Sequence, residues 1–191
     1  HFKNILVVDN NSEDSTAKKA KKYNVYLIKH RYNLGKSESM KTALEFAKIK
    51  KFKYLAFMDS DGQHQTNDLK KICTRILKSK SELVIGYRNN LNNLNLKKRF
   101  GTIILQKLFY LIYKKKIFDI QSGLRIFKIS IENKIYWYST GLSHYFADAE
   151  ITCNAVKNNC KIDQIPIKTI ASKSSKGMNL IQGLYLMLTI F

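Results

Sequence analysis

The chain has 191 residues, a usual length for one domain with a hydrophobic core of its own. It is 45% hydrophobic and 12% aromatic, a composition that excludes an intrinsically disordered chain. Lysine and arginine number 34 against 14 aspartates and glutamates, so the formal net charge is +20 and we expect anionic partners: phosphates, nucleic acid or an acidic membrane surface.

Strand and helix patterns alternate along the chain. Short apolar runs bounded by turn residues predict strands at residues 4–9, 25–29, 54–58, 83–86 and 161–167. Composition and helical spacing predict helices at residues 16–23, 37–48, 69–77 and 97–118, with another around residue 150. This alternation predicts an α/β layered domain with a mainly parallel sheet flanked by helices.

The third predicted strand ends in two carboxylates, Asp59 and Asp61, one residue apart. Side-chain alternation would turn both to the same side, where two close negative charges favour a cation between them. Hard oxygen ligands suit Mg²⁺ or Mn²⁺. The alternative is an ordinary turn, because Asp and Gly favour turns and Asp caps helices. An EF-hand loop is excluded, since its glycine and glutamate positions hold His64 and Lys70.

Two more polar residues, Asp9 and Arg88, fall at predicted strand ends. Ligands gather at the carboxyl ends of strands in such sheets, so this convergence favours the metal interpretation over the turn. The eight glycines form neither GxGxxG nor GxxxxGK[ST], which excludes a dinucleotide fingerprint and a P-loop.

Residues 97–118 combine an apolar, aromatic body with basic triplets at both ends. Five of its apolar residues share one helical face: Phe100, Ile104, Leu108, Leu111 and Ile112. This face is typical of a helix packed on the core with solvated ends. It is equally typical of a helix in a membrane interface with its lysines on lipid phosphates, and basic helices also bind nucleic acid.

The cysteines and the chain ends carry further expectations. Cys73, Cys153 and Cys160 show no CxxC spacing, and their odd number argues against a disulfide framework, so we expect reduced thiols. The chain starts at His1, almost directly on a strand, and we expect it to be part of a longer protein. The apolar residues 178–191 suit a core helix, an interfacial helix or the start of a membrane segment.

Several motifs, in order along the chain, resemble those of family 2 glycosyltransferases, whose fold is called GT-A. Residues 9–16 (DNNSEDST) are similar to the family's DDGSxDGT, residues 33–36 (NLGK) to NxGKG, residues 59–64 (DSDGQH) to DADGQH, and residues 85–88 (IGYR) to IGSR. Residues 119–125 (DIQSGLR) match the DxxSGFR segment of the dolichyl-phosphate mannose synthase branch, and Glu150 and residues 165–167 fit later landmarks. The resemblance covers nearly the whole chain, from Asp9 to about Lys176.

The resemblance implies a GT-A (Rossmann-like) domain over residues 1–170, whose first strand would precede His1, and a possible membrane-associated segment over residues 171–191. It implies metal-dependent, inverting transfer of a sugar from GDP-mannose or a UDP-hexose to a polyprenyl or dolichyl phosphate, with Mg²⁺ or Mn²⁺ as cofactor. The enzyme would work at a membrane surface on the cytoplasmic side, and nucleic acid is not the expected partner. Two alternatives stay open: a soluble sugar or polysaccharide acceptor, and a non-catalytic basic module with a degenerate GT-A fold.

The resemblance also assigns residues to roles. The metal ligands would be Asp59, Asp61 and Gln63. The nucleotide-sugar would contact Asp9, Asn33, Gly35, Lys36 and Asp59. The acceptor phosphate would contact Arg88, Ser122, Gly123 and Arg125. Catalytic roles would fall to Asp61, Arg125, Glu150 and Asp119.

Three positions depart from the family pattern. Asn10 stands at an acidic position of the first motif, and Ser37 replaces the glycine that follows Lys36. Residues 172–176 lack the arginine and glycine usual in that segment, which puts one acceptor-phosphate contact in doubt.

Overall fold

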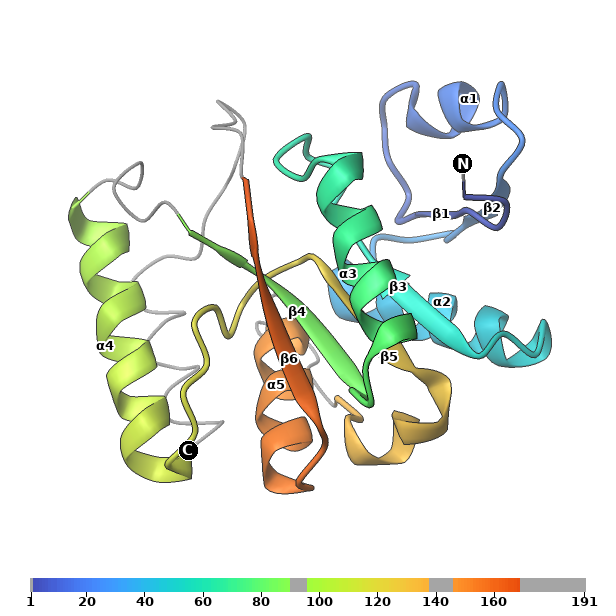
Figure 1. Ribbon diagram of the computed structural model, residues 1–191. Helices are drawn as coiled ribbons and strands as arrows, with labels where there is room; N and C mark the ends of the chain where they lie inside the picture. The colour runs from blue at the N-terminus through green and yellow to red at the C-terminus, as the bar shows by residue number, and fades with distance from the viewer. Residues whose placement is uncertain (1, 90–95, 138–145, 169–191) are drawn as a thin grey trace.

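The computed structural model describes residues 2–89, 96–137 and 146–168, so residues 171–191 lie outside the described part (Figure 1). Its strands are β1 (Leu6–Asp9), β2 (Tyr26–Lys29), β3 (Tyr54–Phe57), β4 (Leu83–Arg88), β5 (Arg125–Lys128) and β6 (Ile162–Ile167). Its helices are α1 (Thr16–Ala20), α2 (Gly35–Ile49), α3 (Thr66–Lys78), α4 (Leu96–Tyr113), the 3₁₀ helix η2 (Ile129–Lys134) and α5 (Ala147–Lys157). Every predicted strand and helix is present, with shifted bounds.

The strands form two sheets. β1 and β2 pair in parallel, and a second sheet has the order β3-β5-β4-β6. β4 and β6 are parallel, whereas β5 runs antiparallel to both β3 and β4. The sheet is therefore mixed, which corrects the predicted mainly parallel sheet. β5 escaped prediction because its four residues begin with a buried charge, Arg125, and so lack an apolar run's signal.

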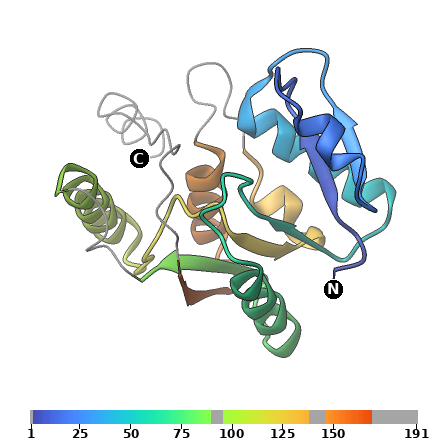
Figure 2. The ribbon, with the colours of Figure 1, turned by 90° about the horizontal axis from the view of Figure 1, so that it is seen from above.

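Helices cover both faces of the four-stranded sheet (Figure 2). On one face, Met40 and Leu44 of α2 and Ile151 of α5 pack with alternate strand residues such as Leu83 and Ile85. The other face packs on α3 through a separate cluster: Ile72, Ile76, Val84, Leu124, Ile126 and Ile167. α2 also contacts β1, so this helix joins the two sheets.

α4 turns three residues of its predicted apolar face outward, Phe100, Leu111 and Ile112, whereas Ile104 and Leu108 of the same face are half-buried. Leu105 and Phe109 on the opposite side of the helix are buried in a cluster with Phe146 of the α5 region. Phe100 and Leu111 are 66% and 58% exposed. Core packing by the predicted face is therefore wrong for these two residues. Among the described helices, none has the length and apolar character that crossing a bilayer requires.

The cysteines are all free thiols. Cys153 and Cys160 are buried, and Cys73 is half-buried. Burial raises the pKa of Cys153 to about 12, so this thiol stays protonated and unreactive at neutral pH.

Candidate active site

The order of the strands brings the third and fifth strands' motifs together. Arg125 at the start of β5 pairs in register with Phe57 at the end of β3. Because the strands are antiparallel, the residues before β5 and the residues after β3 emerge at the same edge. This register places Gly123 against Asp59.

The contact between Gly123 and Asp59 leaves no room for a side chain. A Cβ atom on Gly123 would lie 2.0 Å from Asp59 Oδ2. The glycine's segment is held in place by β4: the Gly86 N–H donates to Leu124 O at 2.9 Å, and the buried Ser122 hydroxyl donates to Gly86 O. Ser122 and Gly123 thus shape the site through packing and backbone. The phosphate contact predicted for the Ser122 side chain has no support in this geometry.

Lys36, in the first turn of α2, bridges two carboxylates. Its Nζ lies 2.7 Å from Asp59 Oδ1 and 2.6 Å from Asp148 Oδ2. Gly35 makes this approach possible, since its φ of 85° belongs to the left-handed region and lets the chain turn into the helix. Burial alone would lower the pKa of Lys36, but the charges of Asp148 and Asp59 outweigh burial and the pKa is raised. Lys36 is therefore a fixed cation.

Asp148 was not among the predicted site residues. It lies in the first turn of α5 and is 3% exposed, whereas Glu150, which was predicted, is half-buried and its charge acts on Cys153. Residues two apart on a helix point in very different directions, so only one of this pair can face the site. The sequence did contain a signal for Asp148, because Asp148 and Glu150 stand in the same helical turn. The resemblance to the family favoured Glu150.

The guanidinium of Arg125 is 0% exposed and its donors are used inside the protein. Nε and Nη2 donate to Ser122 O, and Nη1 donates to Asp148 O and to Thr152 Oγ1. Asp148 Oδ1 also lies 3.2 Å from Nη2, which pairs the two charges. This geometry does not suit the direct phosphate contact predicted for Arg125. It suits a residue that positions Asp148 and the segment around Gly123.

Asp61 and Gln63 follow in the turn after β3. Asp61 is exposed, and its two oxygens accept hydrogen bonds from the Gln63 backbone N–H at 3.0 Å and from Nε2 at 2.7 Å. Gly62, with φ of 80°, makes the turn. Gln63 therefore orients Asp61. No group of three or more His, Cys, Asp or Glu side chains suited to a metal occurs within the described residues.

The pKa of His64 is shifted by the charged residues of this site. Burial lowers its pKa, while the charges of Asp59 and Asp61 raise it and those of Lys36 and Arg88 lower it further. All four charged groups therefore act on one half-buried imidazole. The strand-end carboxylates thus share a region with Lys36 and Arg88.

Arg88, at the end of β4, is held by Asp119. Nε and Nη2 donate to the two carboxylate oxygens at 2.7 and 2.9 Å, and the charge of Asp119 raises the pKa of Arg88. The charge of Asp59 raises it further. Asp119 is 3% exposed, and both of its carboxylate oxygens accept hydrogen bonds from the Arg88 guanidinium. In this arrangement Asp119 orients Arg88.

Two sets of hydrogen bonds lie at the end of β1, one around Asp9 and one that joins Asn10 to Asn33. Asp9 is 2% exposed; its Oδ1 accepts the Ser12 N–H at 3.1 Å, and its buried Oδ2 has no hydrogen-bond partner within the described residues. Asn10 Nδ2 donates to Asn33 Oδ1 at 2.7 Å, and Asn10 Oδ1 accepts the Leu34 N–H. The departure at Asn10 thus has a structural role, because this amide holds the turn before α2.

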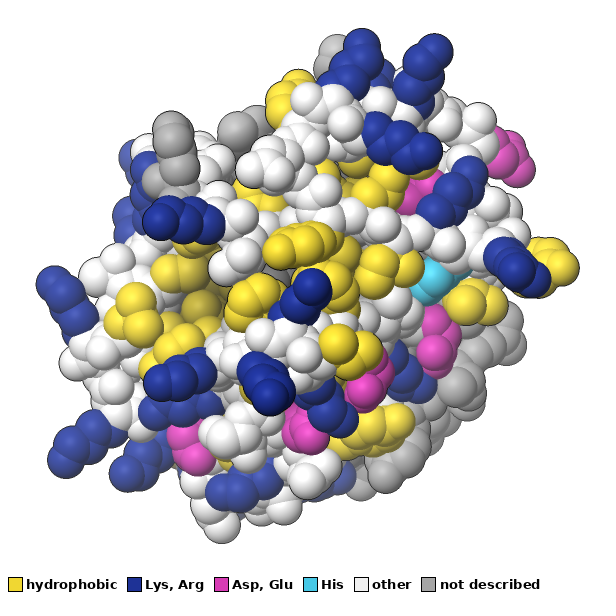
Figure 3. All heavy atoms as spheres, turned by 90° about the vertical axis from the view of Figure 1, so that its right-hand side faces the viewer, with side chains coloured by type: hydrophobic (Ala, Val, Ile, Leu, Met, Phe, Trp, Pro, Cys, Tyr) yellow, Lys and Arg dark blue, Asp and Glu magenta, His cyan; other side chains and the backbone are white. Residues whose placement is uncertain are grey.

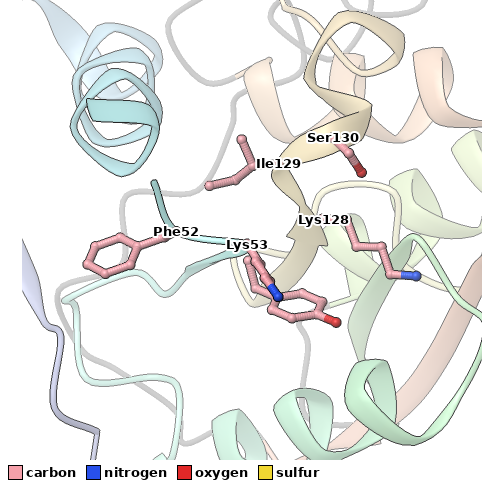
Figure 4. A pocket seen from close by; sticks show the side chains of 6 residues that line it. Phe52, Lys53, Lys128, Ile129 and Ser130 are labelled. Carbon is pink, nitrogen blue, oxygen red and sulfur yellow. The ribbon is translucent and has the colours of Figure 1, made fainter. Parts of the chain in front are cut away.

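A surface hollow of about 370 Å³ lies elsewhere (Figure 4). It is lined by Phe52, Lys53, Tyr54, Lys128, Ile129 and Ser130. These residues surround the start of β3 and the end of β5, whereas Asp59 follows the other end of β3. The hollow contains none of the predicted site residues.

The chain is similar to known proteins over most of its length. Residues 2–136 match the model of the family Glycosyl transferase family 2. The chain is 35% identical over 188 residues to an uncharacterized protein of Methanocaldococcus jannaschii, covering 95% of this chain and 77% of the relative. It is 30% identical over 206 residues to the UDP-N-acetylglucosamine–dolichyl-phosphate N-acetylglucosaminyltransferase of Methanococcus voltae, covering 96% of this chain and 82% of the relative.

The fold has counterparts among solved structures. One is glucosyl-3-phosphoglycerate synthase from Mycobacterium tuberculosis in complex with Mn²⁺, UDP and glucosyl-3-phosphoglycerate, with a TM-score of 0.69 at 13% identity. The match covers 98% of this chain and 66% of that one. The predicted GT-A fold is confirmed, with its sheet mixed. This chain belongs to glycosyl transferase family 2 and is a glycosyltransferase.

Proposed function

We propose that the protein transfers a sugar from a nucleotide-sugar to a polyprenyl or dolichyl phosphate. One observation carries the proposal: Asp59 and Asp61 follow β3 in a region shared with the cations Lys36 and Arg88. Cations placed around a pair of carboxylates suit a leaving diphosphate. The dolichyl-phosphate transferase named among the relatives supports this acceptor class.

Asp59, Asp61 and the Gln63 amide oxygen fit a divalent cation. Mg²⁺ and Mn²⁺ are commonly held by one or two carboxylates, with phosphate oxygens and water completing the shell, so two protein carboxylates are enough. Gly123 leaves the Asp59 carboxylate a space that a Cβ would fill. When bound, the cation would neutralise the charge of the diphosphate leaving group. The solved neighbour with Mn²⁺ and UDP supports this cofactor class.

The donor would lie across the ends of β1 and β3. The Oδ2 atom of Asp9 lies 4.0 Å from Lys29 Nζ and has no hydrogen bond within the described residues, so it is suited to accept one from the base or ribose. The turn at Asn33 and Gly35 would form the wall beside it. Lys36 would contact the diphosphate. Arg88 would contact a phosphate group while Asp119 fixes its direction.

The acceptor would attack without a strong general base, because a phosphate monoester is already anionic at neutral pH. A single in-line displacement inverts the anomeric carbon through a transition state of oxocarbenium character. Asp148, held by Lys36 and Arg125, would face the developing positive charge. Glu150 is a weaker choice for this task, since it lies on another side of α5.

The acceptor's lipid places the reaction at a membrane. α4 offers the outward apolar residues Phe100, Leu111 and Ile112, and exposed lysines follow the helix at residues 114–116. An apolar face next to lysines suits an interfacial helix on anionic lipid. Free cysteines suit the reducing, cytoplasmic side.

On the face shown in Figure 3, lysine and arginine side chains are scattered over the surface rather than gathered in one stripe. A nucleic-acid site usually concentrates its basic residues. Among its described residues, this face therefore does not have the concentrated basic patch that the basic binding module would require.

The function is tested by incubating the chain with UDP- and GDP-sugars, a short polyprenyl phosphate and Mn²⁺. We expect a glycosyl polyprenyl phosphate, with turnover falling by roughly 100-fold or more in EDTA because the leaving group loses its cation. EDTA saturated beforehand with Mn²⁺ is the control. Undiminished transfer in EDTA would contradict the metal assignment. Transfer to soluble sugars alone would favour the other acceptor class, and salt-dependent RNA binding without donor binding would favour the non-catalytic module.

The membrane surface is tested with Leu111→Glu. We expect flotation with anionic vesicles to fall by roughly tenfold or more, because burying a leucine contributes about 1.5–3 kcal/mol and the new carboxylate adds repulsion. Ile49→Glu is the matched control, since Ile49 is an apolar residue 75% exposed on α2. Equal loss of flotation in both variants would remove α4 as the membrane surface.

A further inference from the structure

The Lys36 ammonium occupies a central place among the site's charges. It lies 2.7 Å from Asp59 Oδ1 and 2.6 Å from Asp148 Oδ2, so it joins the end of β3 to the start of α5. The other two cations are committed elsewhere: Arg125 to backbone oxygens and Asp148, and Arg88 to Asp119. Lys36 alone among these three contacts a carboxylate assigned to the metal.

We propose that Lys36 is a built-in competitor of the divalent cation for Asp59, and that the donor's diphosphate relieves the competition. This inference rests on the proposed function. A carboxylate oxygen held at 2.7 Å by an ammonium group binds a second cation less well, because the two positive charges repel at close range. The Asp59 side chain is 36% exposed, so a cation can approach it from solvent.

When a metal ion binds Asp59, the Lys36 ammonium group still has a second carboxylate partner. Its second partner, Asp148, is buried to 5% exposure and is itself anchored by Arg125, so the ammonium keeps one carboxylate after leaving the other. A diphosphate beside it would supply further negative charge. Metal and nucleotide would then bind cooperatively, and by thermodynamic linkage each would strengthen the other by the same factor.

The experiment compares Mn²⁺ binding to the wild type, Lys36→Gln, Lys36→Arg and Lys41→Gln by electron paramagnetic resonance, first with Mn²⁺ alone and then with UDP. Lys41→Gln is matched: Lys41 lies on the same helix and pairs with Glu38 at 2.7 Å, so the variant removes an equal charge from a similar ion pair. Circular dichroism verifies that each variant is folded.

We expect Lys36→Gln to bind Mn²⁺ alone roughly tenfold more tightly than the wild type and to lose most of the increase in affinity that UDP brings. Lys36→Arg, which keeps the charge, and Lys41→Gln should stay within about twofold of the wild type, because a charge outside the site is screened. Unchanged or weaker Mn²⁺ binding by folded Lys36→Gln would overturn the inference and leave the proposed function standing. Absence of Mn²⁺ binding by every protein, with or without UDP, would overturn both.

Discussion

Gly123→Ala is expected to lower turnover by roughly 100- to 1,000-fold, because displacing a reacting or metal-holding group by about 1 Å costs on this scale. The new Cβ would stand 2.0 Å from Asp59 Oδ2 and 3.0 Å from Oδ1, far inside contact distance. The backbone of residues 122–124 is fixed to β4, so the carboxylate must yield. Asp59 would then lose its present contact with Lys36.

Gly101→Ala is the control for this prediction. Gly101 lies on α4, and an added Cβ there has nothing within 4 Å, so the same methyl group is introduced without a clash. Steady-state rates with donor and acceptor saturating, together with the Mn²⁺ affinity of each variant, separate loss of the metal site from loss of the fold. If Gly123→Ala kept both near the wild-type values, Asp59 would not be the carboxylate on which the reaction depends.

The sequence predicted the strands and helices that neighbouring residues along the chain specify. β3 and β4 have apolar runs, and turn residues end them, so their place and the carboxylates at their ends could be predicted. α2 and α3 show helical spacing and were placed within a few residues. These elements carry Lys36, Asp59 and Arg88, which is why much of the candidate site was named in advance.

The parts that escaped prediction depend on distant contacts. β5 forms a strand because it pairs with both β3 and β4. The hydrogen-bond acceptors of its buried Arg125 are brought together only when the chain folds. The choice of Asp148 over Glu150 depends on how α5 is rotated against the sheet. The outward face of α4 depends on which side meets Phe146. Periodicity identified one apolar face on this helix, and that face suited the core and a membrane interface equally well.

Two predicted site residues make a different kind of contact from the one expected. Ser122 and Arg125 were expected to hold a phosphate, yet both donate hydrogen bonds inward to backbone oxygens. A serine hydroxyl and a guanidinium are good phosphate donors and equally good partners for carbonyl groups. Only burial decides between the two uses, and burial belongs to the folded chain.

Arg125→Met is expected to lower the free energy of unfolding by about 3–5 kcal/mol, the usual cost of removing one partner of a buried ion pair. The variant strips the Ser122 and Asp148 carbonyls of charged donors and leaves the buried Asp148 carboxylate with Lys36 as its remaining cation. Urea denaturation measures the loss. Arg75→Met is the control: the Arg75 side chain is 54% exposed in its pair with Asp163, and such pairs contribute about 0–1 kcal/mol.

A double variant identifies the source of that loss. Arg125→Met combined with Asp148→Asn removes the buried negative charge that has lost its arginine, so we expect the double variant to be more stable than the sum of the two single losses predicts, by about 1–3 kcal/mol. Strict additivity would mean that Arg125 stabilises the fold through its hydrogen bonds to the Ser122 and Asp148 carbonyls and to Thr152 alone. The ion pair with Asp148 would then be incidental, and the chain from Arg125 through Asp148 to Lys36 would no longer explain how the site is held in place.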